Sequence, residues 1–66
     1  MSFQVEEKKK YRIYGKEDGD VLDFIVTSID RPKNAVYFKI VYPICAHEGA
    51  VLSSMENRND IEEIKE

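Results

Sequence analysis

The sequence predicts a small all-β domain, a strongly bent antiparallel sheet with no more than one short helical turn. Three observations predict this class. The chain has only 66 residues, and its apolar content is ordinary for a folded domain. Residues 21–29 and 35–42 are rich in β-branched and aromatic side chains. Turn-forming residues cluster between and beside these segments. A chain of this length is expected to form one domain over residues 1–66.

The N-terminal part predicts a polar lead-in followed by one strand. Residues 1–9 are mostly polar, but Phe3 and Val5 alternate with polar neighbours, which leaves a short edge strand open there. From residue 10 onward, Tyr11 and Ile13 also alternate with polar side chains, as in a half-buried strand. A run of charged residues and glycine then predicts a turn at 16–20.

The most apolar segment, residues 21–29, predicts a strand with Leu22, Phe24 and Val26 on one face. A helix would also gather apolar residues here, at i, i+4 spacing. We favour a strand because β-branched side chains dominate and a turn, residues 30–34, follows at once. This turn is a hairpin connection of ordinary length.

Residues 35–42 form the clearest predicted strand. Alternate residues make its apolar face, and these are Val36, Phe38, Ile40 and Tyr42. The opposite face, with Val41 among its residues, is partly apolar as well. A sheet that curls into a small barrel, or a dimer that covers the second face, would explain this pattern. In the turn before the strand, Asn34 is expected in the left-handed region.

The C-terminal part predicts a connection and two short elements. Residues 43–49, which begin with proline and end with glycine, predict a link between strands. Residues 50–55 predict a fourth strand. We favour a single helical turn near 54–59 and a last strand at 60–64, with one helix over the whole tail as the alternative.

This order of short, bent strands, with turns at 16–20, 30–34 and 43–49, resembles the architecture of small SH3-like barrels. The resemblance covers roughly residues 10–64 and rests on the arrangement of elements, not on a family motif. It implies a barrel-like core over 10–64, with residues 65–66 as a tail.

Charge and cysteine content argue against several functional classes. The net charge is −3, which is not the basic balance of a dedicated nucleic-acid binder. The lone cysteine, Cys45, cannot form a disulfide within the chain and suits a reducing compartment. No apolar run resembles a signal peptide or a membrane span. We therefore expect a soluble, cytoplasmic protein that does not bind membranes.

Cys45 and His47 are the only thiol and imidazole in the chain. Two residues at i, i+2 face the same side of an extended segment, so they could hold one metal ion. A structural zinc site needs four nitrogen or sulfur ligands, and one chain supplies two. We predict no metal site, except one shared between two chains. A cysteine–histidine dyad would also need an orienting group and a substrate cleft, so we expect no catalytic residues and no cofactor.

The best nucleic-acid candidate is the basic and aromatic segment Lys8–Lys16. Basic side chains can neutralise phosphate while a tyrosine stacks on an unpaired base. The residues proposed for this role are Lys8, Lys9, Lys10, Tyr11 and Arg12. The alternative is an edge strand whose lysines discourage unwanted strand pairing.

A second candidate surface combines aromatic and basic residues of two strands. Arg12, Tyr14, Tyr37 and Lys39 are expected on the sheet face opposite the main apolar stripe. Tyrosine and arginine are enriched in binding hot spots, although a tyrosine can equally cover the end of a small core.

We therefore expect a non-enzymatic protein-binding module that uses this face or an exposed strand edge, with a homodimer through the same face as a rival. The short chain, rich in Lys, Glu, Ile and Asn, is similar to accessory or inhibitory proteins of bacteria and their phages that dock on larger host proteins. A single-stranded nucleic-acid-binding small barrel is the alternative.

Overall fold

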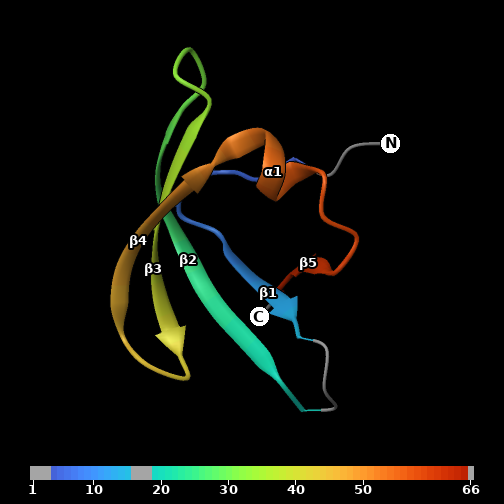
Figure 1. Ribbon diagram of the computed structural model, residues 1–66. Coiled ribbons are helices and arrows are strands. Elements are labelled where there is room, and N and C mark those ends of the chain that lie inside the picture. Colours follow the sequence, from blue (N-terminus) through green and yellow to red (C-terminus); the bar gives the residue numbers. More distant parts are fainter. Residues whose placement is uncertain (1–3, 16–18, 66) are drawn as a thin grey trace.

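A computed structural model describes residues 4–15 and 19–65 and has a mostly β fold (Figure 1). Its elements are β1 (Lys10–Tyr14), β2 (Val21–Asp30), β3 (Ala35–Tyr42), β4 (Ala46–Val51), α1 (Leu52–Glu56) and β5 (Ile61–Glu63). The strands form one antiparallel five-stranded sheet in the order β4-β3-β2-β1-β5. The outermost strands, β4 and β5, lie at opposite ends of this order, so the sheet is not closed into a barrel.

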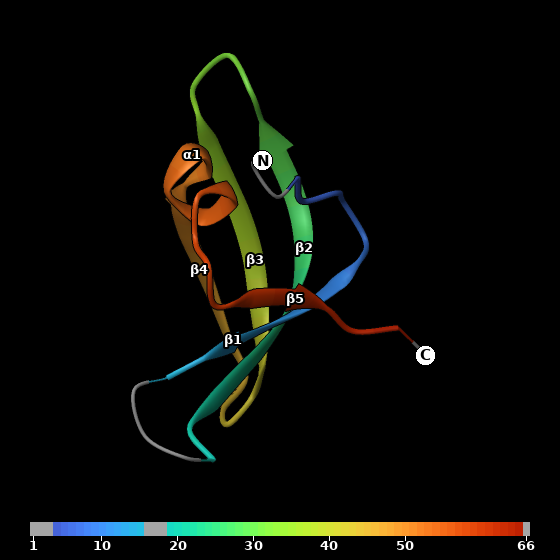
Figure 2. The same ribbon diagram turned by 90° about the vertical axis from the view of Figure 1, so that its right-hand side faces the viewer.

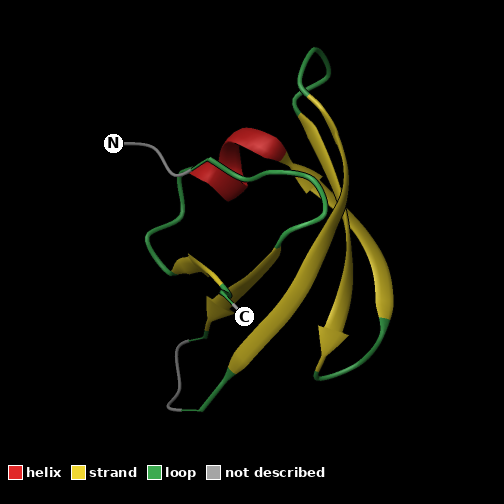
Figure 3. Ribbon diagram, turned by 180° about the vertical axis from the view of Figure 1, so that it is seen from behind, coloured by secondary structure: helices red, strands yellow, loops and turns green. Residues whose placement is uncertain are grey.

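The sheet is strongly bent. Figure 2 shows β2, β3 and β4 running side by side, while β1 and β5 cross them at a large angle. Both α1 and the segment before β1 lie on the same side of the sheet, as the view from behind shows (Figure 3). The concave side is therefore covered by local chain, and the opposite side, called the outer face below, is not covered by any described element.

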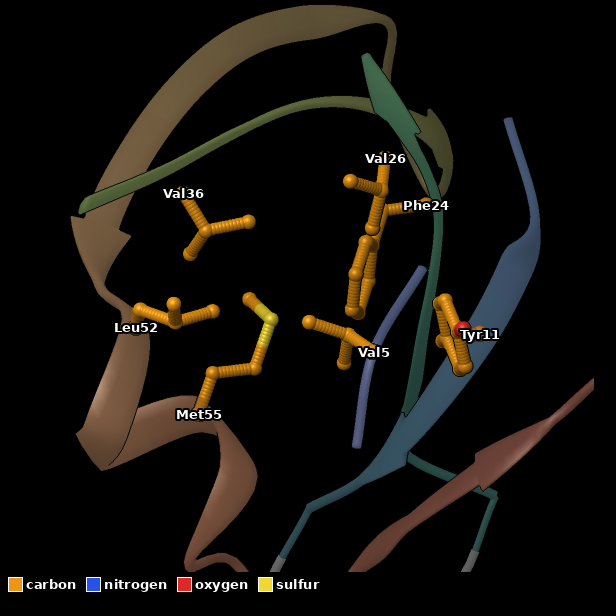
Figure 4. Close-up of a cluster of buried hydrophobic side chains, with 7 residues drawn as sticks. All are labelled: Val5, Tyr11, Phe24, Val26, Val36, Leu52 and Met55. Carbon is orange, nitrogen blue, oxygen red and sulfur yellow. The ribbon is translucent and has the colours of Figure 1, made fainter. Parts of the chain in front are cut away.

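The hydrophobic core fills the concave side (Figure 4). Its buried residues are Val5, Tyr11, Phe24, Val26, Val36, Leu52 and Met55. The Phe24 ring lies at the centre, with ring centroids 5.9 Å from Tyr11 and 4.8 Å from Phe38. The predicted apolar stripe of Leu22, Phe24 and Val26 is thus confirmed as facing the core.

Asn34 joins the β2–β3 turn to the start of α1. It has a φ of 55°, which confirms the left-handed conformation expected of it. Its side chain accepts a hydrogen bond from the Ser53 backbone N–H and donates one to the Ser53 hydroxyl, both at 2.9 Å. Its carbonyl accepts a bond of 2.9 Å from the Leu52 N–H. A residue distant in sequence thereby satisfies two amide groups of the first helical turn, those of Leu52 and Ser53.

The predicted elements after β3 need correction. Residues 50–55 were expected to form a strand, but β4 ends at Val51 and α1 begins at Leu52. The connection predicted at 43–49 is shorter in the structure, because β4 begins at Ala46. Leu52 and Met55 explain the helix, since residues three apart on a helix share one face and both are buried here. The turn-then-strand order of the tail is confirmed, but α1 begins and ends earlier than the turn predicted near 54–59, and β5 is shorter than the strand predicted at 60–64.

The predictions for the N-terminal part are also met only in part. Residues 4–9 form no strand, although Val5 is buried. Phe3 and most of the predicted turn at 16–20 lie outside the described residues. Gly19, which is described, has a φ of 80°.

Two irregularities in the β2–β3 ladder change which face a residue takes. The register shifts between Asp23 and Phe24 and again between Val26 and Ser28. Ile29, which simple alternation from Phe24 and Val26 would place on the outer face, therefore packs against the core. Tyr42, expected on the core face, is exposed instead and pairs with Asp23. An extra residue in one strand reverses the inward and outward alternation beyond it.

Candidate functional site

The residues of the predicted binding face all lie on the outer face, but in two groups. Arg12 and Tyr14 belong to β1, and Tyr37 and Lys39 belong to β3, with β2 between them. Side chains directly opposite in an antiparallel pair project to the same face. The register thus aligns a row across the sheet, made of Lys10, Ile25, Lys39 and His47.

The β1 group is engaged within the sheet. The Arg12 guanidinium donates two hydrogen bonds to the Asp23 carboxylate, from Nε at 2.7 Å and from a terminal nitrogen at 3.1 Å. This contact lowers the pKa of Asp23 and raises that of Arg12. The Tyr14 hydroxyl donates to the Glu62 carboxylate, which raises the pKa of Tyr14. These polar groups already have partners, so a ligand would have to displace them.

The β3 group is more open. Tyr37 is 48% exposed, and its ring lies over Gly49 of β4. The ring is so close that a Cβ added at Gly49 would lie 3.2 Å from it. Glycine at this position thus makes room for the aromatic ring. A shallow hollow of about 310 Å³ lies here, lined by Thr27, Tyr37, Phe38, His47, Glu48 and Gly49.

The backbone of β4 presents the longer open edge of the sheet. The Leu52 N–H donates to the Asn34 carbonyl, so the positions of β4 that bond to β3 are those an even number of residues from Leu52. The N–H and C=O groups of the intervening residues point away from β3, and these residues are His47, Gly49 and Val51. We call these outward groups the β4 edge. Figures 1 and 2 show β4 at the end of the sheet, with β3 on one side and no described strand on the other.

The basic segment of the nucleic-acid hypothesis is divided between core and surface. Tyr11 is only 1% exposed, and its hydroxyl accepts a hydrogen bond of 2.8 Å from the Glu6 N–H. It is therefore not available to stack on a base. Lys9 contacts Glu6 at 2.7 Å. The lysines nevertheless surround a hollow of about 470 Å³, lined by Lys8, Lys9, Lys10, Ile25, Glu63, Ile64 and Lys65.

Cys45 and His47 are both exposed at the start of β4. Among residues 4–15 and 19–65, no group of three or more His, Cys, Asp or Glu side chains is arranged to hold a metal ion. The two-chain site is not tested by a single chain and stays a prediction.

The sequence did not indicate the β4 edge or its neighbouring apolar surface. Alanine, histidine, glutamate and glycine dominate β4, so its composition resembles a loop more than a strand. The signal that could have indicated β4 was its cross-strand partner in β3. The exposed Tyr37 ring needs a small residue opposite it, and Gly49 is that residue. Exposed apolar side chains continue around the end of β3, and these are Val41, Tyr42 and Ile44.

The chain was compared with known proteins at the levels of family, sequence and structure. No protein-family model, no curated protein and no solved structure matches it. Within the described residues, no helix has the length and apolar character to cross a membrane.

Proposed function

We propose that this protein is a non-enzymatic module that binds another protein where the outer face meets the β4 edge. The observation that carries the proposal is the combination found on β4. The outward backbone groups of three alternate residues lie beside Tyr37 and Val51, which are 48% and 50% exposed. An extended segment that adds to such an edge gains affinity from backbone hydrogen bonds and specificity from the side chains on either face.

The role that fits this surface is that of an accessory or inhibitory protein, of bacterial or phage origin, that occupies a site on a larger cytoplasmic protein. Binding through an edge needs no cleft, and a chain of 66 residues has little room for one. Tyr37 would act as the aromatic anchor and Lys39 as its basic neighbour. Arg12 and Tyr14 would have the lesser part, since both have partners in the sheet.

The finer architecture belongs to the same proposal. We consider the sheet an open relative of the small SH3-like barrel. Three features support this relationship. Strands β1 to β4 pair consecutively and antiparallel, a helix lies between β4 and β5, and β5 returns to pair with β1.

A photo-crosslinking experiment tests the binding surface. A photoreactive amino acid is placed at Tyr37 in one variant and at Glu62 in a matched control, and both are irradiated in bacterial cells that produce the protein. Both positions lie on the outer face and both are exposed, but only Tyr37 adjoins the β4 edge. We expect one discrete protein adduct from position 37 and at most a minor one from position 62, which lies beside Arg12 and Tyr14. Equal adducts from both, or none from either, would contradict the proposed surface.

Single-stranded nucleic-acid binding is the second candidate, and the lysine-lined hollow is the observation that favours it. Lys9→Glu with Lys10→Glu should abolish binding of a labelled oligonucleotide, whereas Lys33→Glu in the β2–β3 turn should not. Binding by the unaltered protein should fall steeply as salt rises, because phosphate contacts release counterions. Failure of every oligonucleotide to bind at low salt excludes this candidate.

A further inference from the structure

The β4 edge lacks most of the devices that usually prevent strand pairing, although Glu48, opposite Phe38, places one charge on its concave face. Exposed edges are commonly protected by lysine, by proline, by a bulge or by a very short strand. β4 is six residues long, contains neither lysine nor proline, and pairs with β3 without a register shift. The opposite edge, β5, has three residues, two of which are glutamates. An edge left open on one side only is suited to receive a strand.

Backbone geometry restricts how a second β4 strand can pair with the first. Outward residues of one copy must lie opposite outward residues of the other to exchange hydrogen bonds. In an antiparallel pair related by a two-fold axis, an axis beside any residue of the strand meets this condition, but only an axis beside Glu48, Gly49 or Ala50 pairs at least two outward residues of each β4 strand. These arrangements differ in which side chains become neighbours.

An axis beside Glu48 would place the two Glu48 carboxylates directly opposite each other. They would form a non-hydrogen-bonded pair, in which the Cα atoms are only about 4.5 Å apart, and like charges so placed are destabilising. An axis beside Ala50 would bring His47 opposite Ser53, which already belongs to α1. The first arrangement therefore places like charges together, and the second leaves His47 without a partner in β4.

An axis beside Gly49 uses all the outward groups. Gly49 then lies opposite its own copy and exchanges both hydrogen bonds with it. His47 lies opposite Val51, and Glu48 lies opposite Ala50. No like charges face each other in this register.

We propose that the β4 edge pairs with the β4 strand of a second copy of this chain, antiparallel and centred on Gly49, to make one continuous sheet across a two-fold dimer. This inference rests on the part of the proposed function that makes the β4 edge a docking strand, and it names a second copy of this chain, in place of a larger protein, as the strand that the edge binds.

Neighbouring side chains support this occupant. The Tyr37 rings, which lie over Gly49, would flank the axis and cover the paired glycines from the outer face. On the other face, Glu48 of one copy would enter the neighbourhood of Ala50 of the other. There, Ala50 and Arg58 line a hollow of about 160 Å³, and the Arg58 guanidinium, which already donates two hydrogen bonds to Asp60, would add a positive charge near the Glu48 carboxylate. Dimer formation would also add burial to a chain whose own core is small.

The register has a consequence for Cys45 and His47. With Gly49 on the axis, the two His47 residues are offset by four positions, or about 13 Å along the strand. This dimer therefore does not assemble the shared metal site. Added Zn²⁺ should leave its dissociation constant unchanged.

Disulfide trapping tests the register directly. In a Cys45→Ala background, Glu48→Cys and Ala50→Cys chains are oxidised separately and as a mixture, and Asn59→Cys serves as an exposed control. The proposed register brings positions 48 and 50 of different copies within disulfide reach. We expect the mixed 48–50 dimer to form at least tenfold faster than either self-dimer or the control. Preferential self-linking at 48, preferential self-linking at 50, or equal linking by the control would overturn it.

Sedimentation equilibrium supplies the second measurement. His47→Pro removes an outward N–H and no bond to β3, so it should fold normally and weaken self-association about tenfold or more, because two hydrogen bonds are lost per dimer. A chain that stays monomeric up to millimolar concentration overturns the inference. If position 37 still crosslinks to a different protein, the proposed function survives that failure. A dimer with no other crosslinked protein would instead support the inference and contradict the accessory role.

Discussion

The two edges of this sheet differ in length, charge and exposure. β5 is three residues long. The carboxylate of its Glu62 accepts a hydrogen bond from the Tyr14 hydroxyl, and its Ile61 is half-buried opposite Ile13. β4 is twice as long, and much of its surface, including Val51, is exposed. One edge is thus short, charged and tied to its neighbour, and the other is left open. The difference indicates that the edges have different roles, with β5 completing the fold and β4 offering the contact.

The largest expected effect comes from proline at adjacent positions of β4. Glu48→Pro removes an N–H that bonds to β3, whereas His47→Pro removes one that points outward. Both side chains are exposed, so the pair isolates the backbone. Glu48→Pro should lower the free energy of unfolding by about 1–3 kcal/mol, because a carbonyl of β3 loses its donor. His47→Pro should change it by less than about 0.5 kcal/mol.

Urea denaturation followed by circular dichroism measures both variants. Equal losses of stability would show that β4 has no outward edge, and the comparison between the two edges would then fail.

Truncation of one apolar side chain at each edge gives the next largest effect. Ile61→Ala should lower the free energy of unfolding by about 1–2 kcal/mol, because a partly buried side chain loses its contact with Ile13. Val51→Ala should cost less than about 0.5 kcal/mol in the monomer, since half of Val51 is already in water. The midpoints of thermal and urea unfolding, compared at low protein concentration, check both values. A larger loss at Val51 would assign the structural role to β4.

The sequence predicted the central hairpin better than either edge. Residues 21–29 and 35–42 carry strong β-formers, and their strands appear within a residue of the predicted bounds. Side-chain alternation also predicted the buried face, except where register shifts moved Ile29 inward and Tyr42 outward. Such shifts depend on how two strands pair, so a single strand's pattern does not reveal them.

The edges escaped prediction for a different reason. β4 consists of weak strand formers, and its conformation comes from pairing with β3 and not from its own residues. α1 likewise depends on Asn34, a residue in a distant turn. The four residues of the candidate face share the outer face, as strand alternation predicts, but β2 separates them into two groups. Two of the four, Arg12 and Tyr14, bond to Asp23 and Glu62 on neighbouring strands. These partners can be identified only when the pairing of the strands is known.

The smallest expected effect is an acid-induced loosening confined to the β1–β5 side. The pKa values of Glu6, Asp23 and Asp60 are lowered by Lys9, Arg12 and Arg58 respectively. These carboxylates lie before β1, on β2 beside β1, and before β5, and none of them lies on β3 or β4.

A lowered pKa in the folded state means that the folded chain binds the proton less readily than the unfolded chain does. The stabilisation from Asp23 is therefore fully present above the unfolded value of about 3.9 and is lost as the pH falls through the lower folded value. Amide hydrogen exchange between about pH 5 and pH 2.5, corrected for intrinsic rates, should show protection falling first in β1 and β5. Asp23→Asn should reduce this pH dependence in β1. An equal loss of protection in β4 would mean that the edges respond as one unit, and that the charged contacts of β1 and β5 do not set that side of the sheet apart.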